Sequence, residues 1–239
     1  MTELPPQRTF DTLTVIMPVF NERATVAEII RRMRAVELPV VLQIIVVDDG
    51  SNDGTDKVLH ALEDSTVRVM SHPHNQGKGA AIRTGLAEAR GDLVMIQDAD
   101  LEYDPDDWPR LLEPILKGKA RVVYGSRFTG ERKNMMPLHW LGNRLLSLLT
   151  NVLYSSTLSD METCYKVFDA QVLEGLTIVS NRFEFEPEIT AKVLRRGHRI
   201  YEVPISYAGR EPDEGKKITW RDGFSALAAL IRYRFTKDY

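Results

Sequence analysis

The chain has 239 residues, of which 43% are hydrophobic and 27% charged, and its net charge is −3 at pH 7. This composition is that of a soluble globular domain, and the negative balance argues against a general nucleic-acid binder. The single cysteine, Cys164, excludes an internal disulfide, and the N-terminus lacks the apolar stretch of a signal peptide. Both features favour a reducing, cytoplasmic compartment, and no run of about 18 apolar residues predicts a membrane-spanning helix.

Strand-like and helix-like segments alternate through the first half of the chain. The expected strands are residues 13–17, which stop at Pro18, and residues 43–47, 67–70, 93–96 and 121–124. The expected helices are residues 24–35, a short helix opened by the turn-rich stretch 48–55, and residues 77–89 and 106–117. Such alternation is typical of right-handed crossovers, so the sequence predicts an α/β fold with one mostly parallel, twisted sheet and helices on both faces.

Polar segments follow four of the expected strands. Ligands of parallel sheets bind beyond the carboxyl ends of the strands. We therefore expect these segments to share one rim of the sheet: Pro18–Glu22, Asp48–Asp49, Asp98–Glu102 and Gly125–Arg127.

The most acidic of these segments is QDADLEYDP, in which Asp98, Asp100 and Glu102 fall within five positions. Like charges so close together repel, and no lysine or arginine follows before Arg110. A divalent cation is the first candidate for compensation, because Mg²⁺ is usually held by one or two carboxylates and substrate phosphates. The alternative is a polar turn that caps the next helix, with Asp104 or Asp106 as the N-cap.

Two glycine-containing segments also open helices. In VVDDGSNDGT, Asp49 can accept hydrogen bonds from a base or ribose, whereas Ser51 or Asp53 can simply cap the next helix. In NQGKGAAIRTG, the spacing fits neither a Walker loop nor a dinucleotide-binding fingerprint. It is still a helix N-terminus able to face a phosphate, with Lys78 either touching the ligand or lying in solvent.

These motifs together resemble a known family. PVFNE, VVDDGSNDGT, NQGKGAAIRTG, QDADLEYDP and YGSRF occur in the order found in the family 2 inverting nucleotide-sugar glycosyltransferases. The closest resemblance is to dolichol-phosphate mannose synthases and bacterial polyprenyl-phosphate glycosyltransferases. It covers residues 12–220 and implies a single GT-A domain, a nucleoside-diphosphate (NDP) sugar donor, and Mg²⁺ or Mn²⁺. Residues 1–11 are then a tail, and residues 221–239 an amphipathic C-terminal helix.

The resemblance also implies roles for individual residues. The nucleotide pocket would be lined by Pro18, Phe20, Glu22, Val47, Asp49 and Lys78. Asp98 and Ala99 would contact the nucleoside or sugar, Asp100 would be the main metal ligand, and Glu102 would assist it. Arg127 would face the phosphates or the acceptor. Arg210, Lys216 and Lys217 would lie on a loop that closes over the diphosphate; without the resemblance they are simply a solvated basic loop.

Two departures from the family pattern lie beside the donor. Phe20 stands where such synthases often have tyrosine, and the synthases often have a glutamine near the position of Glu102. The loop from Arg210 to Lys216 is also longer than the usual spacing. Both GDP-mannose and a UDP-hexose therefore remain candidate donors.

The acceptor side is indicated by two apolar segments. Residues 138–158 form a helical pattern with Arg144 as the only charged residue, and the apolar face is either core or a membrane-surface helix. The segment GFSALAALIRYRFTKDY mixes basic and aromatic residues, which suits an anionic membrane surface, or it packs on the edge of the sheet. The membrane surface is therefore an expected partner.

Asp160 and Glu162, in SDMETCYKVF, are the candidate acids for the acceptor. A hydroxyl acceptor needs one of them as general base, whereas a lipid phosphate is already largely ionised and needs none. In the second case they would orient Arg127, Lys166 or the donor sugar. We expect transfer of a sugar to a polyprenyl phosphate, with a hydroxyl acceptor or a non-catalytic nucleotide-sugar-binding module as the alternatives. His139 and His198 are expected to be structural or surface residues.

Overall fold

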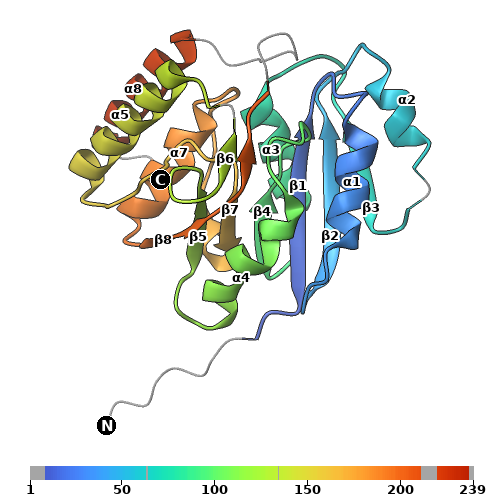
Figure 1. Cartoon of the computed structure of the whole chain (residues 1–239), viewed down its shortest axis with the longest axis horizontal. Helices are drawn as coiled ribbons and strands as arrows, with labels where there is room; N and C mark the ends of the chain where they lie inside the picture. The colour runs from blue at the N-terminus through green and yellow to red at the C-terminus, as the bar shows by residue number, and fades with distance from the viewer. Residues whose placement is uncertain (1–8, 63, 134, 211–219, 237–239) are drawn as a thin grey trace.

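The computed structural model describes residues 9–62, 64–133, 135–210 and 220–236, and side chains of residues 220–222 are not among the described parts. A seven-stranded sheet in the order β3-β2-β1-β4-β7-β5-β8 forms its centre (Figure 1). Only β7 runs antiparallel to its neighbours β4 and β5. The strands are β1 (Thr12–Val19), β2 (Val41–Asp48), β3 (Val67–Ser71), β4 (Leu93–Ile96), β5 (Val122–Ser126), β7 (Lys166–Asp169) and β8 (Ile200–Pro204). A second small sheet pairs β6 (Arg132–Lys133) with β9 (Tyr207–Ala208).

Helices cover both faces of the sheet. They are α1 (Val26–Ala35), α2 (Thr55–His60), α3 (Lys78–Glu88), α4 (Trp108–Leu116), α5 (Pro137–Tyr154), α6 (Ala170–Leu173), α7 (Phe185–Arg195) and α8 (Trp220–Phe235), with a 3₁₀ turn at Pro105–Asp107. Alternate residues of β1 serve opposite faces: Val15 packs in the same core cluster as Ile29 of α1, while Ile16 faces α3. Gly85 makes this second contact possible, because a Cβ there would lie 2.5 Å from Ile16. The predicted α/β fold is confirmed.

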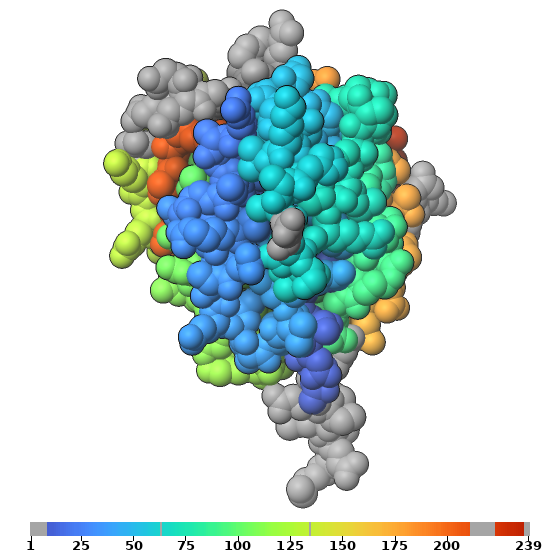
Figure 2. Space-filling view, turned by 90° about the vertical axis from the view of Figure 1, so that its right-hand side faces the viewer, coloured from blue at the N-terminus to red at the C-terminus, as the bar shows by residue number. Residues whose placement is uncertain are grey.

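The N-terminal half supplies one continuous side of the molecule, seen in blue to green in Figure 2. Every strand and helix expected in this half is present, with ends shifted by a few residues. The prediction that the first strand stops at Pro18 was wrong, because β1 continues to Val19. Proline, which has no N–H to donate, is tolerated there because β4 pairs with β1 only as far as Ile16. Beyond Ile16, β1 is paired with β2 on one side and with no strand on the other among the described residues.

Helices α5 and α8 lie side by side at one end of the sheet (Figure 1). The Tyr154 hydroxyl donates a 2.6 Å hydrogen bond to the Leu230 carbonyl, and Leu230 is fully buried. The C-terminal helix thus packs on α5 and α7 rather than standing free. Within the described residues, no helix is long and apolar enough to cross a membrane.

Helix α5 has apolar side chains on two faces. Its inward face buries Ser147 and Thr150 and packs apolar side chains against a buried cluster of Leu158, Met161 and Leu230: Leu146, Leu149, Leu153 and Tyr154. The outward stripe is 59–80% exposed and consists of Leu138, Leu141, Leu145, Leu148 and Val152. The alternative that the apolar residues of this segment belong to the core therefore holds for the inward face and not for the outward stripe.

Candidate active site

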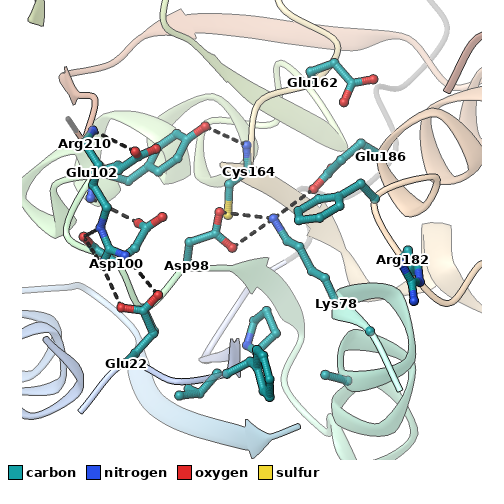
Figure 3. A pocket seen from close by; sticks show the side chains of 18 of the residues that line it. Glu22, Lys78, Asp98, Asp100, Glu102, Glu162, Cys164, Arg182, Glu186 and Arg210 are labelled. Atoms are coloured by element: carbon teal, nitrogen blue, oxygen red, sulfur yellow. Dashed lines mark hydrogen bonds and ion pairs between the residues drawn. The ribbon is translucent and has the colours of Figure 1, made fainter. Parts of the chain in front are cut away.

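A cavity of about 360 Å³ opens at the carboxyl ends of β1, β4 and β5, where the sequence predicted a ligand rim (Figure 3). It brings together twelve of the residues proposed for the site from the sequence: Pro18, Phe20, Glu22, Asp49, Lys78, Asp98, Ala99, Asp100, Glu102, Arg127, Glu162 and Arg210. Val47 differs, because it is fully buried and packs with Ile45 and Ala81 in a small core cluster. Lys216 and Lys217 lie outside the described residues.

The three carboxylates after β4 have separate environments. Both oxygens of Asp98 pair with the Lys78 ammonium, at 2.9 and 3.1 Å. Glu102 accepts a 2.8 Å hydrogen bond from the Tyr207 hydroxyl. Among the described residues, the Asp100 carboxylate accepts a hydrogen bond only from the backbone N–H of Glu102. Burial, and then the charges of Asp98 and Glu102, raise the pKa of Asp100 to about 7, although Arg210 acts in the opposite direction.

The predicted three-carboxylate metal site is not assembled. Among the described residues, no group of three His, Cys, Asp or Glu side chains converges on a point that could hold a metal ion. The reason is that Asp98 turns to Lys78 and Glu102 turns to Tyr207. The raised pKa of Asp100 still shows that the positive charge near this carboxylate does not offset burial and the negative charges of Asp98 and Glu102. The Asp100 carboxylate together with diphosphate oxygens is a ligand set that fits a hard divalent cation.

Arg210 spans the acidic rim. Its guanidinium donates to the two carboxylate oxygens of Glu22 at 3.1 and 2.6 Å and to the Asp100 carbonyl at 2.8 Å. Its backbone N–H donates to Glu102 at 2.9 Å. Arg210, the first residue of the expected basic loop, therefore already places a positive charge against the carboxylates of this rim. A diphosphate and its cation would lie on the same side of the cavity.

The backbone turns tightly on both sides of this rim. Asn21 has φ 53° and Leu101, between Asp100 and Glu102, has φ 63°. The left-handed region costs a non-glycine residue about 1 kcal/mol or more, and such strain is typical of functional sites. At Leu101 it points the flanking carboxylates in the different directions described above.

Asp49 and the start of α3 are occupied by contacts within the protein. Asp49 accepts from the backbone N–H groups of Gln76 and Gly77, at 2.9 and 2.7 Å, and from His72 at 2.7 Å. The Ala80 N–H donates to the Asn181 carbonyl at 3.1 Å. The segment after α6 therefore takes one N–H of this helix N-terminus, whereas Gly77 and Lys78 still line the cavity, and a contact of this terminus with a phosphate stays a prediction.

The glycines of this segment have a packing role. A Cβ on Gly77 would lie 2.3 Å from the Asn181 carbonyl oxygen, and one on Gly79 would lie 2.5 Å from the Ser180 carbonyl oxygen. Both positions therefore require glycine so that α3 and residues 180–182 can meet. The expected helix caps gave a mixed result: Asp104 caps the 3₁₀ turn, whereas Gly54 rather than Ser51 or Asp53 is the N-cap of α2.

The acceptor-side residues form a buried ion pair and an isolated acid. Arg127 donates to both carboxylate oxygens of Asp160 at 2.7 Å, and its backbone N–H adds a 3.0 Å bond. Asp160 is fully buried and serves to hold Arg127. Glu162 lines the cavity, and its Oε1 is buried without a hydrogen-bond partner in the described structure. Burial, and then the charge of Glu186, raise the pKa of Glu162 to about 7.

Several cavity residues were not identified from the sequence. His139, expected to be structural or at the surface, lines the cavity, as do Asn143, Arg182, Phe183, Glu186 and Tyr207. The sequence did contain a signal for Glu186, because the stretch FEFEPEI alternates acidic residues with apolar ones. In the structure Glu186 and Glu188 of this stretch are buried in α7. Charged residues are rarely fully buried without a partner, so such a pattern points to ion pairs inside the protein.

The fold and this rim are those of a glycosyltransferase of the GT-A type. The model of the family described as Glycosyl transferase family 2 matches residues 14–176. The chain belongs to this family.

Among curated proteins, it is similar to a low-salt glycan biosynthesis hexosyltransferase of Haloferax volcanii (33% identity, covering 92% of this chain and 53% of the relative). It is also similar to the undecaprenyl-phosphate 4-deoxy-4-formamido-L-arabinose transferase of Pseudomonas aeruginosa (31%, covering 86% and 60%). A third relative is the dodecaprenyl-phosphate galacturonate synthase of Rhizobium johnstonii (28%, covering 95% and 68%). The chain thus spans little more than half the length of the first two relatives.

Solved structures agree on the fold. Glucosyl-3-phosphoglycerate synthase from Mycobacterium tuberculosis, in complex with Mn²⁺, UDP and phosphoglyceric acid, superposes with a TM-score of 0.75 over 95% of this chain and 80% of its own. The same enzyme was also solved with Mg²⁺ and UDP. Sequence identity is 22% and 23%, so the likeness confirms the GT-A fold and nothing finer.

Proposed function

We propose that this chain is an inverting glycosyltransferase that moves a sugar from an NDP-sugar, either GDP-mannose or a UDP-hexose, to a polyprenyl phosphate. Mg²⁺ or Mn²⁺ would act at the diphosphate. The names of the Pseudomonas and Rhizobium relatives support a polyprenyl-phosphate acceptor. The complexes of the Mycobacterium enzyme support a nucleoside diphosphate with a divalent cation.

The observation that carries the acceptor class is the two-sided character of α5. His139 and Asn143, one helical turn apart, line the cavity. The exposed stripe of Leu138, Leu141 and Leu145 begins at the same end of the helix. An acceptor with a polar head and a long apolar chain fits both sides, because its phosphate can enter the cavity while its chain follows the stripe.

The same stripe supports seating on a membrane surface. Phe224, Ile231 and Phe235 of the neighbouring α8 are 45–76% exposed, and Arg232 and Arg234 are exposed beside them. Apolar and aromatic residues with flanking cations suit the interface of an anionic bilayer. We infer that the protein is peripheral on the cytoplasmic membrane face, where a lipid phosphate is available to it.

The cavity residues divide the chemistry between donor and acceptor. The acceptor oxygen attacks the anomeric carbon on the face opposite the diphosphate, and the bond to the diphosphate oxygen breaks with its electron pair. Asp100 would hold a divalent cation there, which would supply Lewis-acid stabilisation of that leaving group. Arg210 adds positive charge at the same side of the cavity. Arg127, held by Asp160, faces the attacking anion.

A hydroxyl acceptor is the second candidate, and one observation favours it. Glu162 has an unpartnered oxygen and a pKa of about 7, which are the properties of a general base. A lipid phosphate needs no such base, so Glu162 would then act only by contacting the acceptor or the donor sugar.

The test is a transfer assay with the purified chain, Mn²⁺ or Mg²⁺, and a panel of radiolabelled GDP- and UDP-sugars. Each donor is combined with C55 polyprenyl phosphate or with soluble hydroxyl acceptors. We expect label in the lipid phase with one donor. Label found only in soluble products would move the assignment to a hydroxyl acceptor. Hydrolysis and transfer both absent, with intact nucleotide binding, would indicate a binding module.

A further inference from the structure

A chain of buried charges runs from the donor side of the cavity into the protein core. Glu186, at the second position of α7, has a side chain that is only 3% exposed and lies between two lysines. Its Oε2 pairs with Lys166, and its Oε1 lies 3.2 Å from the Lys78 ammonium. Lys78 in turn pairs with Asp98 (Figure 3). The charges therefore alternate along Asp98, Lys78, Glu186 and Lys166.

The inner end of this chain is fixed. Lys166 is fully buried in β7 and donates to the Met161 carbonyl at 3.1 Å and to the Thr163 carbonyl. Its ammonium also lies 4.7 Å from the centre of the Tyr124 ring. With these contacts the lysine is held by the backbone before β7, and Glu186 supplies the opposite charge that a buried ammonium requires.

The outer end of the chain faces the donor. The Lys78 side chain is 15% exposed at the cavity wall, and its ammonium contacts both oxygens of Asp98. A protonated Lys78 placed in this way holds Asp98 in one orientation, toward the bound nucleoside or sugar.

We propose that Glu186 is a positioning residue for the donor: it holds the Lys78 ammonium on Asp98 and so fixes the carboxylate that the nucleotide sugar meets. This inference rests on the proposed function. A purely structural ion pair would require only Lys166, whereas Glu186 uses its second oxygen on a lysine of the cavity. The contact links α7 to the start of α3, which the Asn181 carbonyl already caps.

The same helix provides a matched control. Glu188, two residues later, is also fully buried and pairs with Lys192 at 2.5 Å. It also accepts the backbone N–H groups of Val179 and Ser180, at 2.9 and 2.7 Å. Glu188 is not among the residues that line the cavity. Glu188→Gln therefore removes a comparable buried charge from α7 at a position that neither lines the cavity nor pairs with Lys78.

The experiment measures GDP and UDP binding by calorimetry and donor and acceptor KM values for the wild type, Glu186→Gln and Glu188→Gln. Glu186→Gln removes one charge of the buried Glu186–Lys78 ion pair, which corresponds to about tenfold or more, so we expect this variant to raise the nucleotide Kd and the donor KM by that factor. The acceptor KM should stay within about twofold, and Glu188→Gln should leave both nucleotide values unchanged.

Two further variants keep the test decisive if Glu186→Gln fails to fold. Glu186→Asp retains the charge for Lys166 but is one methylene too short to bridge both lysines, so it should show the same rise in donor KM. In a Lys78→Met background, Glu186→Asp should cause no additional loss of nucleotide affinity.

Equal nucleotide Kd in folded Glu186 variants and the wild type would overturn the positioning role. So would equal losses in Glu186→Gln and Glu188→Gln, which indicate a structural effect. A wild-type chain that binds neither nucleotide would instead refute the proposed function, and the positioning role with it. The two failures are therefore distinguishable by the wild-type titration alone.

Discussion

Glu162→Gln is the most informative single substitution, because the acid is isolated within the protein. Its Oε1 is buried without a hydrogen-bond partner in the described structure. Burial and the charge of Glu186 raise its pKa to about 7, whereas Lys166 and Arg127 act in the opposite direction. Glutamine has nearly the same shape and no charge to bury, so the variant should be more stable than the wild type wherever Glu162 is ionised.

The size and pH range of this effect follow from the two pKa values. The folded-state pKa of about 7 lies above the ordinary 4.5, so the native state binds the proton more tightly than the unfolded chain. Stability therefore falls as the pH rises from about 4.5 to about 7 and is lowest above 7. At 1.36 kcal/mol per pH unit the difference is roughly 3 kcal/mol, an upper value for a side chain that is not completely enclosed.

The assay is urea unfolding of the wild type and Glu162→Gln at pH 5 and pH 8. We expect a gain for the variant of about 1–3 kcal/mol at pH 8 and a much smaller one at pH 5. The exposed Glu174 provides the control, since Glu174→Gln should change stability by less than about 0.5 kcal/mol at either pH. A Glu162→Gln variant that is no more stable at pH 8 than the wild type would refute the burial of an unpaired charge.

The same variant separates the two acceptors. With a lipid phosphate no base is needed, and Glu162→Gln should retain measurable transfer. With a hydroxyl acceptor Glu162→Gln should lose about 10²–10⁴-fold, the usual contribution of a general base. Near-complete loss in the folded variant would therefore contradict the lipid-phosphate assignment. Asp160→Asn should lower transfer with either acceptor, because it breaks the buried pair that holds Arg127.

Three other outcomes are expected. Asp100→Ala should lower kcat by at least about 10²-fold with the fold intact, and EDTA should abolish activity reversibly; full activity in excess chelator would contradict the cation. Arg210→Ala should lower kcat more than it weakens nucleoside binding, because the contacts of Arg210 lie at the diphosphate side of the cavity. Equal losses in kcat and in nucleoside binding would mean that Arg210 stabilises the bound nucleotide before the reaction rather than the transition state. Leu141→Asp should weaken binding to anionic vesicles about tenfold or more. Val41, which is comparably exposed on β2, provides the control variant Val41→Asp. Equal vesicle binding by the two variants would exclude α5 from the membrane interface.

The fold of the first half was predictable because its signals are local. Residues 43–47 and 93–96 are short, β-rich apolar runs, and the crossover rule alone converts them into parallel strands with a shared rim. The acidic segment at Asp98–Asp100 followed from the same rule. What the rule could not provide was the partner of each acid, because Lys78 and Tyr207 reach these carboxylates from elements far away in the chain.

The separate directions of the carboxylates could not be predicted for a related reason. Spacing along an extended segment places Asp100 and Glu102 on one side only if the backbone between them stays extended. Leu101 instead has φ 63°, which turns Glu102 away toward Tyr207. A left-handed leucine has no sequence signature, so the orientation of these side chains could be obtained only from the structure.

The acceptor side shows how strand direction decides which residues reach a site. In parallel strands such as β4, the rim receives the residues that follow the strand, which is why Asp98 and Asp100 were found there. Strand β7 runs the opposite way between β4 and β5, so the rim receives the residues that precede it. Asp160 therefore pairs with Arg127, which follows β5, although 33 positions separate the two residues, and Glu162 lines the same cavity. One antiparallel strand in an otherwise parallel sheet thus brings Glu162 to the rim that carries Asp98 and Asp100, where the proposed donor and acceptor would meet.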